Sequence, residues 1–308
     1  MASPFFSIVI PTYNRAHLIE KAVNSVLKQT FKDWELIIVD DGSTDNTMQV
    51  ISDFLASDKR IKYFYQENQE RSIARNNGIE KATGKYVCFL DSDDYYLENR
   101  LLNIKANINK NDVQFLFTDI VFKDSTRSFT KYAVDFCEKN VFNNIVLSLI
   151  GTPQVCIKRN ILHEFKFNPN LIVGEDLELW LRIATKHPIF YLKNEPSVIA
   201  LEHNERTVNY SSFNSGKFQL RTFKLILAPS HSGDKISISI KREMISDTYF
   251  NIFKYYFYVN KRIDCLYYVS RSILANIFSR QLKYRINILV RLMITKRISN
   301  LKYLLEHE

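Results

Sequence analysis

Three carboxylates follow an apolar run in the first third of the chain. Residues 86–90 (YVCFL) lead directly into Asp91, Ser92, Asp93 and Asp94. Such a run predicts a strand buried on both faces, with the acids at its carboxyl end. Ionised carboxylates in apolar surroundings are costly unless a cation balances them, and Mg²⁺ and Mn²⁺ prefer carboxylate oxygens. We therefore expect Asp91 and Asp93 to bind a divalent cation; the alternative is a solvated acidic turn.

Alternating strand and helix patterns predict the sheet that carries these acids. Apolar runs indicate strands over residues 7–11, 34–39, 61–65 and 86–90. Apolar residues at helical spacing indicate helices over residues 17–29, 48–55 and 72–82. This alternation predicts an α/β fold with a mostly parallel sheet flanked by helices.

A second pair of acids is expected at the same edge of the sheet. Asp40 and Asp41 follow the strand over residues 34–39, and the carboxyl ends of parallel strands lie on one side. A carboxylate there can accept the imide N–H of a uracil or a ribose hydroxyl. Tyr13, after the first strand, offers a ring face for base stacking. The alternative for residues 40–45 is an ordinary turn before a helix.

Four segments, in order along the chain, resemble the signatures of glycosyltransferase family 2. They are SIVIPTYNR (7–15), VDDGSTDNT (39–47), ARNNGI (74–79) and GKYVCFLDSDD (84–94). The similarity is dense over the first hundred residues and continues more weakly to about residue 205. It implies a GT-A fold, a nucleotide-sugar donor, transfer with inversion, and an enzyme of the bacterial surface-polysaccharide type.

The resemblance implies roles for individual residues around the nucleotide. Asp41 has the position of the family's base-recognition carboxylate, with Pro11 and Tyr13 beside the nucleobase. Arg75 would lie near the diphosphate, as its charge also suggests. One residue departs from the pattern, because Glu70 stands where the family commonly has a glycine. The backbone conformation that a glycine would allow in this loop is therefore not assured.

The resemblance also implies the metal ligands of the donor site. Asp93 has the position of the family's metal ligand, with Asp91 close to ribose and metal and Ser92 in the donor site between them. His203 follows a short predicted strand, and family members often have a histidine here that approaches the metal or the diphosphate. The alternative for His203 is a solvated or hydrogen-bonded surface group.

Glu175 and Asp176 begin a second informative helix, in the segment VGEDLELWLRI (173–183). One interpretation is that these acids stabilise the start of the helix through its dipole. The other is catalytic, because Gly-Glu-Asp before an apolar helix resembles the family's base motif, with Asp176 as the base. Inverting transfer by direct displacement needs a base on the acceptor hydroxyl. We favour this role for Asp176.

The positive charge of the chain is concentrated in its last third. Residues 217–308 hold 17 Lys+Arg and 6 Asp+Glu, whereas residues 1–216 hold 25 and 27. Apolar residues, many of them Tyr and Phe, recur among these bases at helical spacing. We expect a GT-A catalytic domain over residues 1–215 and a basic, aromatic-rich helical region over residues 216–308.

Basic amphipathic helices of this composition suit an anionic membrane surface, with aromatics at the interface and bases on the headgroups. The alternative is a helical subdomain whose apolar stripe packs on the catalytic domain, and both can hold. We expect no nucleic-acid partner, because no recognition motif accompanies the charge. The sequence does not predict the oligomeric state.

Cysteine spacing and the N-terminal residues indicate the compartment. The four cysteines lie far apart with no C-x-x-C pair, which favours a reducing environment over a zinc site or a disulfide framework. The first residues lack the basic and apolar regions of a signal peptide, and no run of 18 apolar residues occurs. We expect a cytoplasmic location, free or peripheral on the cytoplasmic face of the membrane.

Together these patterns predict a metal-dependent inverting glycosyltransferase. It would move a hexosyl or N-acetylhexosaminyl group from a UDP-linked donor to a saccharide or lipid-linked saccharide, with Mn²⁺ or Mg²⁺ as cofactor. A haloacid-dehalogenase-like phosphatase would need Thr or Val where Tyr95 stands, and a nucleotidyltransferase would need a glycine-rich loop at residues 11–14 (PTYN). A non-catalytic saccharide- or lipid-binding protein on the same fold is the remaining alternative. Loss of Asp93 or Asp176 would favour it, and both are present.

Overall fold

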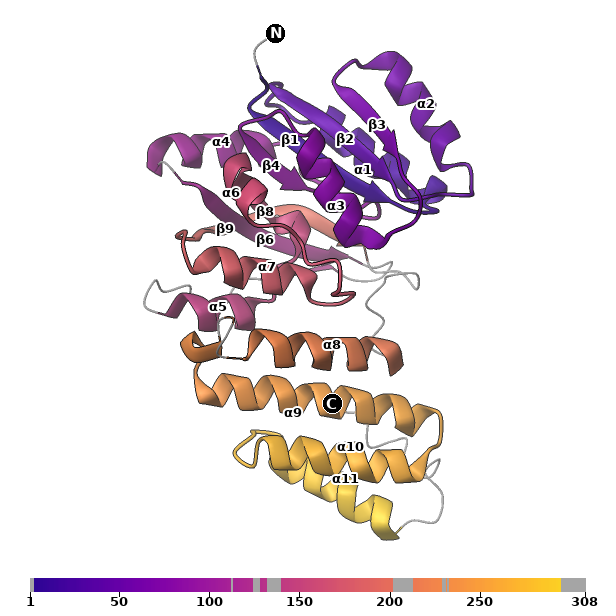
Figure 1. The fold of residues 1–308 in the computed structure, drawn as a ribbon, viewed down its shortest axis with the longest axis vertical. Coiled ribbons are helices and arrows are strands. Elements are labelled where there is room, and N and C mark those ends of the chain that lie inside the picture. The colour runs from indigo at the N-terminus through magenta and orange to yellow at the C-terminus, as the bar shows by residue number, and fades with distance from the viewer. Residues whose placement is uncertain are drawn as a thin grey trace. The chain divides into compact units, whose positions relative to one another are not determined.

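The structure is a computed structural model that describes residues 3–111, 113–123, 128–131, 140–201, 213–228, 231 and 233–294. It divides into two units, Met1–His203 and Asn204–Glu308 (Figure 1). The first unit carries the predicted donor and base motifs, and the second carries the basic helical region.

The first unit is built on a nine-stranded sheet. Its strands are β1 (Phe6–Thr12), β2 (Trp34–Asp40), β3 (Ile61–Tyr65), β4 (Tyr86–Phe89), β5 (Tyr95–Tyr96), β6 (Phe115–Lys123), β7 (Ser128–Lys131), β8 (Val155–Lys158) and β9 (Phe190–Leu201). The strand order is β3-β2-β1-β4-β8-β6-β9-β5, and β7 pairs with β6 outside this path. The strands β1 to β4 are parallel, as predicted. Beyond them the sheet is mixed, because β8 runs antiparallel to both β4 and β6.

Helices cover both faces of the parallel part. The helices of this unit are α1 (Ala16–Leu27), α2 (Thr47–Ser57), α3 (Glu70–Lys81), α4 (Arg100–Asn111), α5 (Val141–Ser148), α6 (Arg159–Glu164) and α7 (Glu175–Ala184). Ile8 and Ile10 of β1 share a buried core with Ile19 of α1. Val9, which points to the other face, lies against Gly78 of α3, where an added Cβ would be 2.3 Å from Val9 Cγ1. A glycine is therefore required for α3 to approach the sheet this closely.

The second unit has a hydrophobic core of its own. Its helices are α8 (Phe213–Ile226), α9 (Ile238–Tyr258), α10 (Arg262–Ala275) and α11 (Leu282–Ile294), with a 3₁₀ turn at Gly233–Lys235. The predicted apolar stripes face inward, where Phe253, Val269 and Leu292 pack together from three helices. None of the helices that the structure describes has the length and hydropathy needed to span a bilayer.

A buried arginine joins three helices of this unit. Arg285 of α11 donates from Nη1 to Oγ of Ser272 on α10 at 2.7 Å, and to Oγ of Ser246 on α9. Its Nη2 donates to Asp247 Oδ1 on α9, and its guanidinium lies 4.7 Å from the ring centre of Phe250. Hydrogen bonds to a charged group contribute roughly 1.5–3 kcal/mol each, so these contacts stabilise the packing of α9, α10 and α11.

Replacing Arg285 with methionine should loosen this bundle selectively. The substitution keeps the apolar stem but removes donors to buried hydroxyls, at a cost of roughly 3 kcal/mol. We expect amide hydrogen exchange in α10 and α11 to accelerate by about 100-fold, with exchange in β1 and β2 unchanged. The control is Arg291→Met in the same helix, whose arginine donates from Nε to Asn287 Oδ1 at 3.0 Å and is more exposed than Arg285. Equal protection in the two variants would contradict the role assigned to Arg285.

Candidate active site

The acids after β4 lie together, as their sequence predicts. Carboxylate oxygens of Asp91, Asp93 and Asp94 all lie within 4.8 Å of one another. The turn is held by the Asp94 N–H, which donates to Asp91 O at 3.1 Å, and by the Leu201 N–H, which donates to Asp94 Oδ1 at 3.1 Å. The end of β9 therefore fixes Asp94, which is buried, beside the other two carboxylates.

This donor set fits a hard divalent cation. All the grouped ligand atoms are carboxylate oxygens, which suit Mg²⁺ and Mn²⁺. Asp91 gives only its Oδ1 to the Arg75 guanidinium, at 2.8 Å. The predicted pair, Asp91 and Asp93, is thus joined by a third acid, Asp94, to which no separate role was assigned from the sequence.

The nucleobase candidates meet at the ends of β1 and β2. Pro11 pairs in register with Val39, and the Asp41 N–H donates to Thr12 O at 2.8 Å. Tyr13, the next residue, is 47% exposed and has its ring available for stacking. The structure therefore brings Pro11, Tyr13 and Asp41 to adjacent positions, as predicted from the parallel sheet.

Asp41 is buried but keeps one oxygen available. Its Oδ1 accepts hydrogen bonds from Gln66 Nε2 at 2.6 Å and from the Gln69 N–H at 2.9 Å. Its Oδ2 has no hydrogen-bond partner among the residues that the structure describes. Asp40 differs, since it accepts from the Ser43 N–H and the Tyr63 hydroxyl, each at 2.8 Å, and so holds the turn instead.

The loop with the unexpected glutamate keeps a glycine-like backbone. Glu70 has φ = 72°, in the left-handed region that favours glycine. The preceding residue, Gln69, is bound through its N–H to Asp41. The loop thus adopts this conformation with glutamate in place of glycine, and it anchors Asp41, the carboxylate predicted to recognise the base.

Arg75 connects the two sets of acids. From α3, its Nη2 donates to Asp91 Oδ1 and its Nη1 donates to Glu175 Oε1, both at 2.8 Å. Burial alone would lower the pKa of Arg75, but the charges of Asp91, Glu175 and Asp176 raise it above its usual value. This side chain, 3% exposed, therefore remains a cation between carboxylates from opposite halves of the unit.

A second arginine, one turn earlier on α3, was not expected. Arg71 Nε lies 3.0 Å from Glu175 Oε1, and its Nη2 donates to the carbonyl oxygen of Ile172. Arg71 and Arg75 are four residues apart, so they lie on one face of the helix. That spacing is the signal from which the pair could have been found.

Asp176 has the electrostatics of a general base. Burial raises its pKa to about 7, with a further contribution from the charge of Glu175. The Leu177 N–H, which donates to Asp176 Oδ1 at 2.7 Å, and the charges of Arg75 and Arg71 oppose this rise. A carboxyl that titrates near neutral pH can take a proton from an alcohol far better than an ordinary aspartate.

His203 and residues 202–212 lie outside the described residues, so the histidine's role stays a prediction.

Comparison with known proteins identifies the family. The family model described as glycosyl transferase family 2 matches residues 7–163. The chain belongs to this family. Among its relatives is the Escherichia coli protein WfgD, named UDP-Glc:alpha-D-GlcNAc-diphosphoundecaprenol beta-1,3-glucosyltransferase. It is 34% identical over 185 residues, which cover 59% of this chain and 71% of WfgD.

Solved structures show the same fold. The Staphylococcus aureus protein TarS in complex with UDP-GlcNAc superposes with a TM-score of 0.62 at 19% identity, over 92% of this chain and 83% of that one. The mannosyltransferase PcManGT from Pyrobaculum calidifontis, in complex with GDP-Man and Mn²⁺, gives a TM-score of 0.63 at 15% identity, over 99% and 84%. The expected GT-A fold is thereby confirmed.

Several relatives are much longer than the matched region. Glycosyltransferases of three Rickettsia species, 31–34% identical, align over only about a third of their own length. The similarity therefore identifies a shared domain and leaves activity and substrates to be argued from the site itself.

Proposed function

We propose that this chain transfers a sugar from a nucleotide-sugar donor to an acceptor hydroxyl, with inversion. The observation that carries the proposal is the Arg75 bridge, which joins Asp91 of the acidic turn to Glu175, the residue before Asp176. It connects the candidate cation site of the acidic turn to the residue before a carboxyl of raised pKa. We place this site in a catalytic domain over residues 1–215, followed by the helical region.

On the donor side, Asp41 would accept a nucleobase N–H through Oδ2, with Pro11 and Tyr13 against the ring. Ser92, in the acidic turn, would contact the donor. Asp93, Asp91 and Asp94 would hold Mn²⁺ or Mg²⁺, and His203 is a further candidate ligand. Such a cation, when bound, neutralises charge on the departing nucleoside diphosphate. We propose a UDP-linked hexose or N-acetylhexosamine as the donor.

On the acceptor side, Asp176 would orient the hydroxyl and take its proton. The acceptor oxygen forms a bond to the anomeric carbon as the bond from that carbon to the diphosphate oxygen breaks. The proton passes to Asp176, and the nucleoside diphosphate leaves with the bonding electrons. Attack opposite the leaving group inverts the anomeric centre. Glu175 is engaged by Arg71 and Arg75, which leaves Asp176 as the group that would accept the proton.

We propose a saccharide or lipid-linked saccharide of cell-surface polysaccharide synthesis as the acceptor. The name of WfgD, with its diphosphoundecaprenol-linked acceptor, supports this choice. A lipid-linked acceptor lies at a membrane, and the excess of 17 Lys+Arg over 6 Asp+Glu in residues 217–308 suits attachment to an anionic cytoplasmic face.

A donor screen tests the transferase directly. UDP- and GDP-linked sugars would be incubated with the protein, with and without Mn²⁺ or Mg²⁺, and scored for released nucleoside diphosphate. We expect one donor to be turned over at least about tenfold faster with cation than after chelation. Binding of a saccharide without release from any donor would instead support the non-catalytic alternative.

A further inference from the structure

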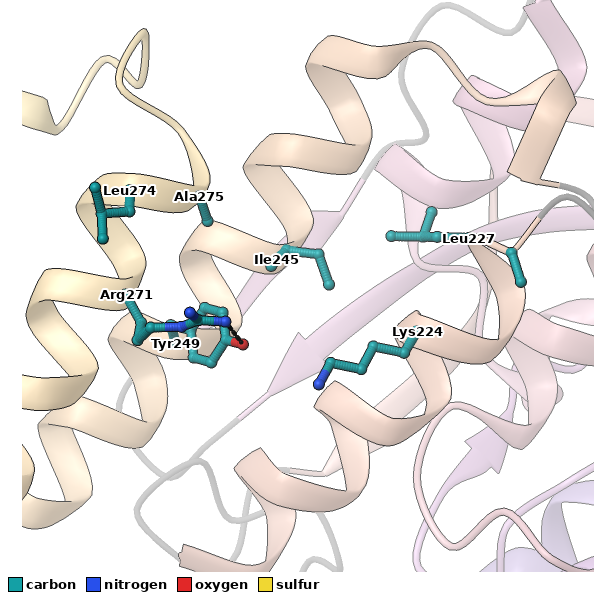
Figure 2. A pocket seen from close by; sticks show the side chains of 8 residues that line it. Lys224, Leu227, Ile245, Tyr249, Arg271, Leu274 and Ala275 are labelled. Atoms are coloured by element: carbon teal, nitrogen blue, oxygen red, sulfur yellow. Dashed lines mark hydrogen bonds between the residues drawn. The ribbon is translucent and has the colours of Figure 1, made fainter.

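The helical unit contains a hollow of its own, lined by residues that belong to none of the sequence motifs discussed above. It has a volume of about 480 Å³, within the range of about 300–1,000 Å³ for small-molecule sites. It lies among α8, α9 and α10 (Figure 2). The lining residues are Lys224, Leu227, Ala228, Ile245, Tyr249, Arg271, Leu274 and Ala275.

The polar groups of this hollow are two cations and a hydroxyl. Arg271 Nη2 donates to the Tyr249 hydroxyl at 3.2 Å, so its partner is neutral. Figure 2 shows the Lys224 amine pointing from α8 toward this pair. Neither Lys224 nor Arg271 forms an ion pair with any carboxylate that the structure describes. Two positive charges thus face one hollow, and no described carboxylate is paired with either of them.

A phosphate group matches this arrangement. Its oxygens could accept hydrogen bonds from the Arg271 guanidinium and from the Lys224 ammonium. The Tyr249 hydroxyl accepts from Arg271 and still has its own proton to donate. The tyrosine itself is buried, so its hydroxyl is held in place.

The rest of the hollow and its margin are apolar. Leu227 and Ile245 line it together with Leu274, which is 72% exposed. Past the end of α10, Ile277 and Phe278 are 52% and 78% exposed. These large apolar side chains are exposed and lie close in sequence to a cationic hollow. Such a surface suits a ligand that has a phosphate group next to acyl chains.

We propose that this hollow binds the phosphate headgroup of an anionic phospholipid in a bilayer, with Leu274, Ile277 and Phe278 entering the acyl boundary. This assignment rests on the proposed function, in which the acceptor is bound to a membrane. The site would hold the enzyme where that acceptor is presented. It takes no part in the transfer chemistry.

Vesicle co-sedimentation of the full chain tests the site. The vesicles would contain phosphatidylcholine alone, or with a third phosphatidylglycerol, at about 0.1 M salt. We expect binding to the anionic vesicles only. The double variant Lys224→Gln/Arg271→Gln should bind them about 30-fold more weakly, the effect of two cations at an anionic surface. Leu274→Ser should also weaken binding, although it changes no charge.

The control removes the same charge elsewhere in the unit. Lys261→Gln/Arg291→Gln also removes one lysine and one arginine, at the opposite end of α10, where Arg262 contacts the end of α11. We expect its affinity to fall less than about threefold. All four cations are at least partly exposed, so circular dichroism should confirm that both double variants fold.

Two results would overturn the proposal. Equal loss in the two double variants would mean that only overall charge matters and that the hollow is not a headgroup site. Calorimetry could also show that inorganic phosphate binds the wild-type chain at Lys224 and Arg271 as tightly as the vesicles do. The hollow would then be a site for a soluble anion. Neither result would affect the donor screen, so failure of this site is distinguishable from failure of the transferase proposal.

Discussion

The Asp176→Asn variant should bind donor almost normally and turn over about a thousandfold more slowly. Asparagine has the same shape and can still accept the hydrogen bond from the Leu177 N–H, so the start of α7 should be preserved. It cannot take a proton from the acceptor hydroxyl, and loss of a general base typically costs 10²–10⁴ in rate. The loss should fall on kcat, because Asp176 acts only as the reaction proceeds.

Single-turnover kinetics with saturating donor would measure this loss, and calorimetry would measure donor affinity. The matched control is Glu175→Gln, which changes the adjacent acid. We expect it to weaken the Arg71 and Arg75 contacts and to lower stability more than the proton-transfer step. If Asp176→Asn retained even a tenth of the wild-type kcat, Glu175 or another group would have to be the base.

The pH dependence of kcat/KM in the wild-type enzyme should reflect the ionisation of Asp176. Burial first, and then the neighbouring charge of Glu175, raise the pKa of Asp176 to about 7. A base works only when ionised, so kcat/KM should rise about tenfold per pH unit below this value and level off above it. The residual activity of Asp176→Asn should lack this acidic limb. A limb that persists in the variant would belong to a different group.

The second large effect is expected at the acidic turn. Asp93→Asn should weaken the cation-dependent binding of a nucleoside diphosphate by on the order of 100-fold, because changing groups that merely orient metal ligands already costs 10–100-fold. It removes one of three carboxylates whose oxygens lie within 4.8 Å. Binding measured in the presence of a chelator should be the same in both proteins, since the nucleobase contacts are intact.

Titration calorimetry would measure the affinity for UDP with Mn²⁺ and without it. Asp53→Asn is the control, because Asp53 is an exposed acid on α2. Its loss changes net charge by the same amount and should leave both affinities as they were. An unchanged Mn²⁺-dependent affinity in Asp93→Asn would remove Asp93 from the proposed ligand set.

The parts of the site that local signals describe could be predicted from the sequence. Apolar runs ending in acids marked β2 and β4, and the parallel order then placed Asp41 and Asp91 at one edge. Glu70 was recognised as the unusual residue of its loop. Only the structure, however, shows that the loop keeps φ = 72° there and is tied to Asp41 through Gln69.

The parts that depend on distant contacts could not be predicted. The antiparallel strand β8 lies beside β4, although 65 residues separate their facing ends, and no local pattern gives such a neighbour. Arg100 is a similar case, because it looks like an ordinary surface base at the start of a helix. It is buried, and it donates to Thr118 Oγ1 at 2.8 Å and to Pro153 O at 2.9 Å. Partners of this kind are determined by tertiary packing.

The bridge from Arg75 to Glu175 spans 100 residues, and this has a consequence during translation. At about 5–20 residues per second, a ribosome needs roughly 5–20 s to add Glu175 after Arg75. β8, which covers one edge of β4, is also completed within that interval. Meanwhile the nascent chain exposes an unpaired apolar strand edge, and Arg75 has Asp91 but lacks its second carboxylate partner. We expect this intermediate to be a preferred substrate for chaperones that bind at the ribosome.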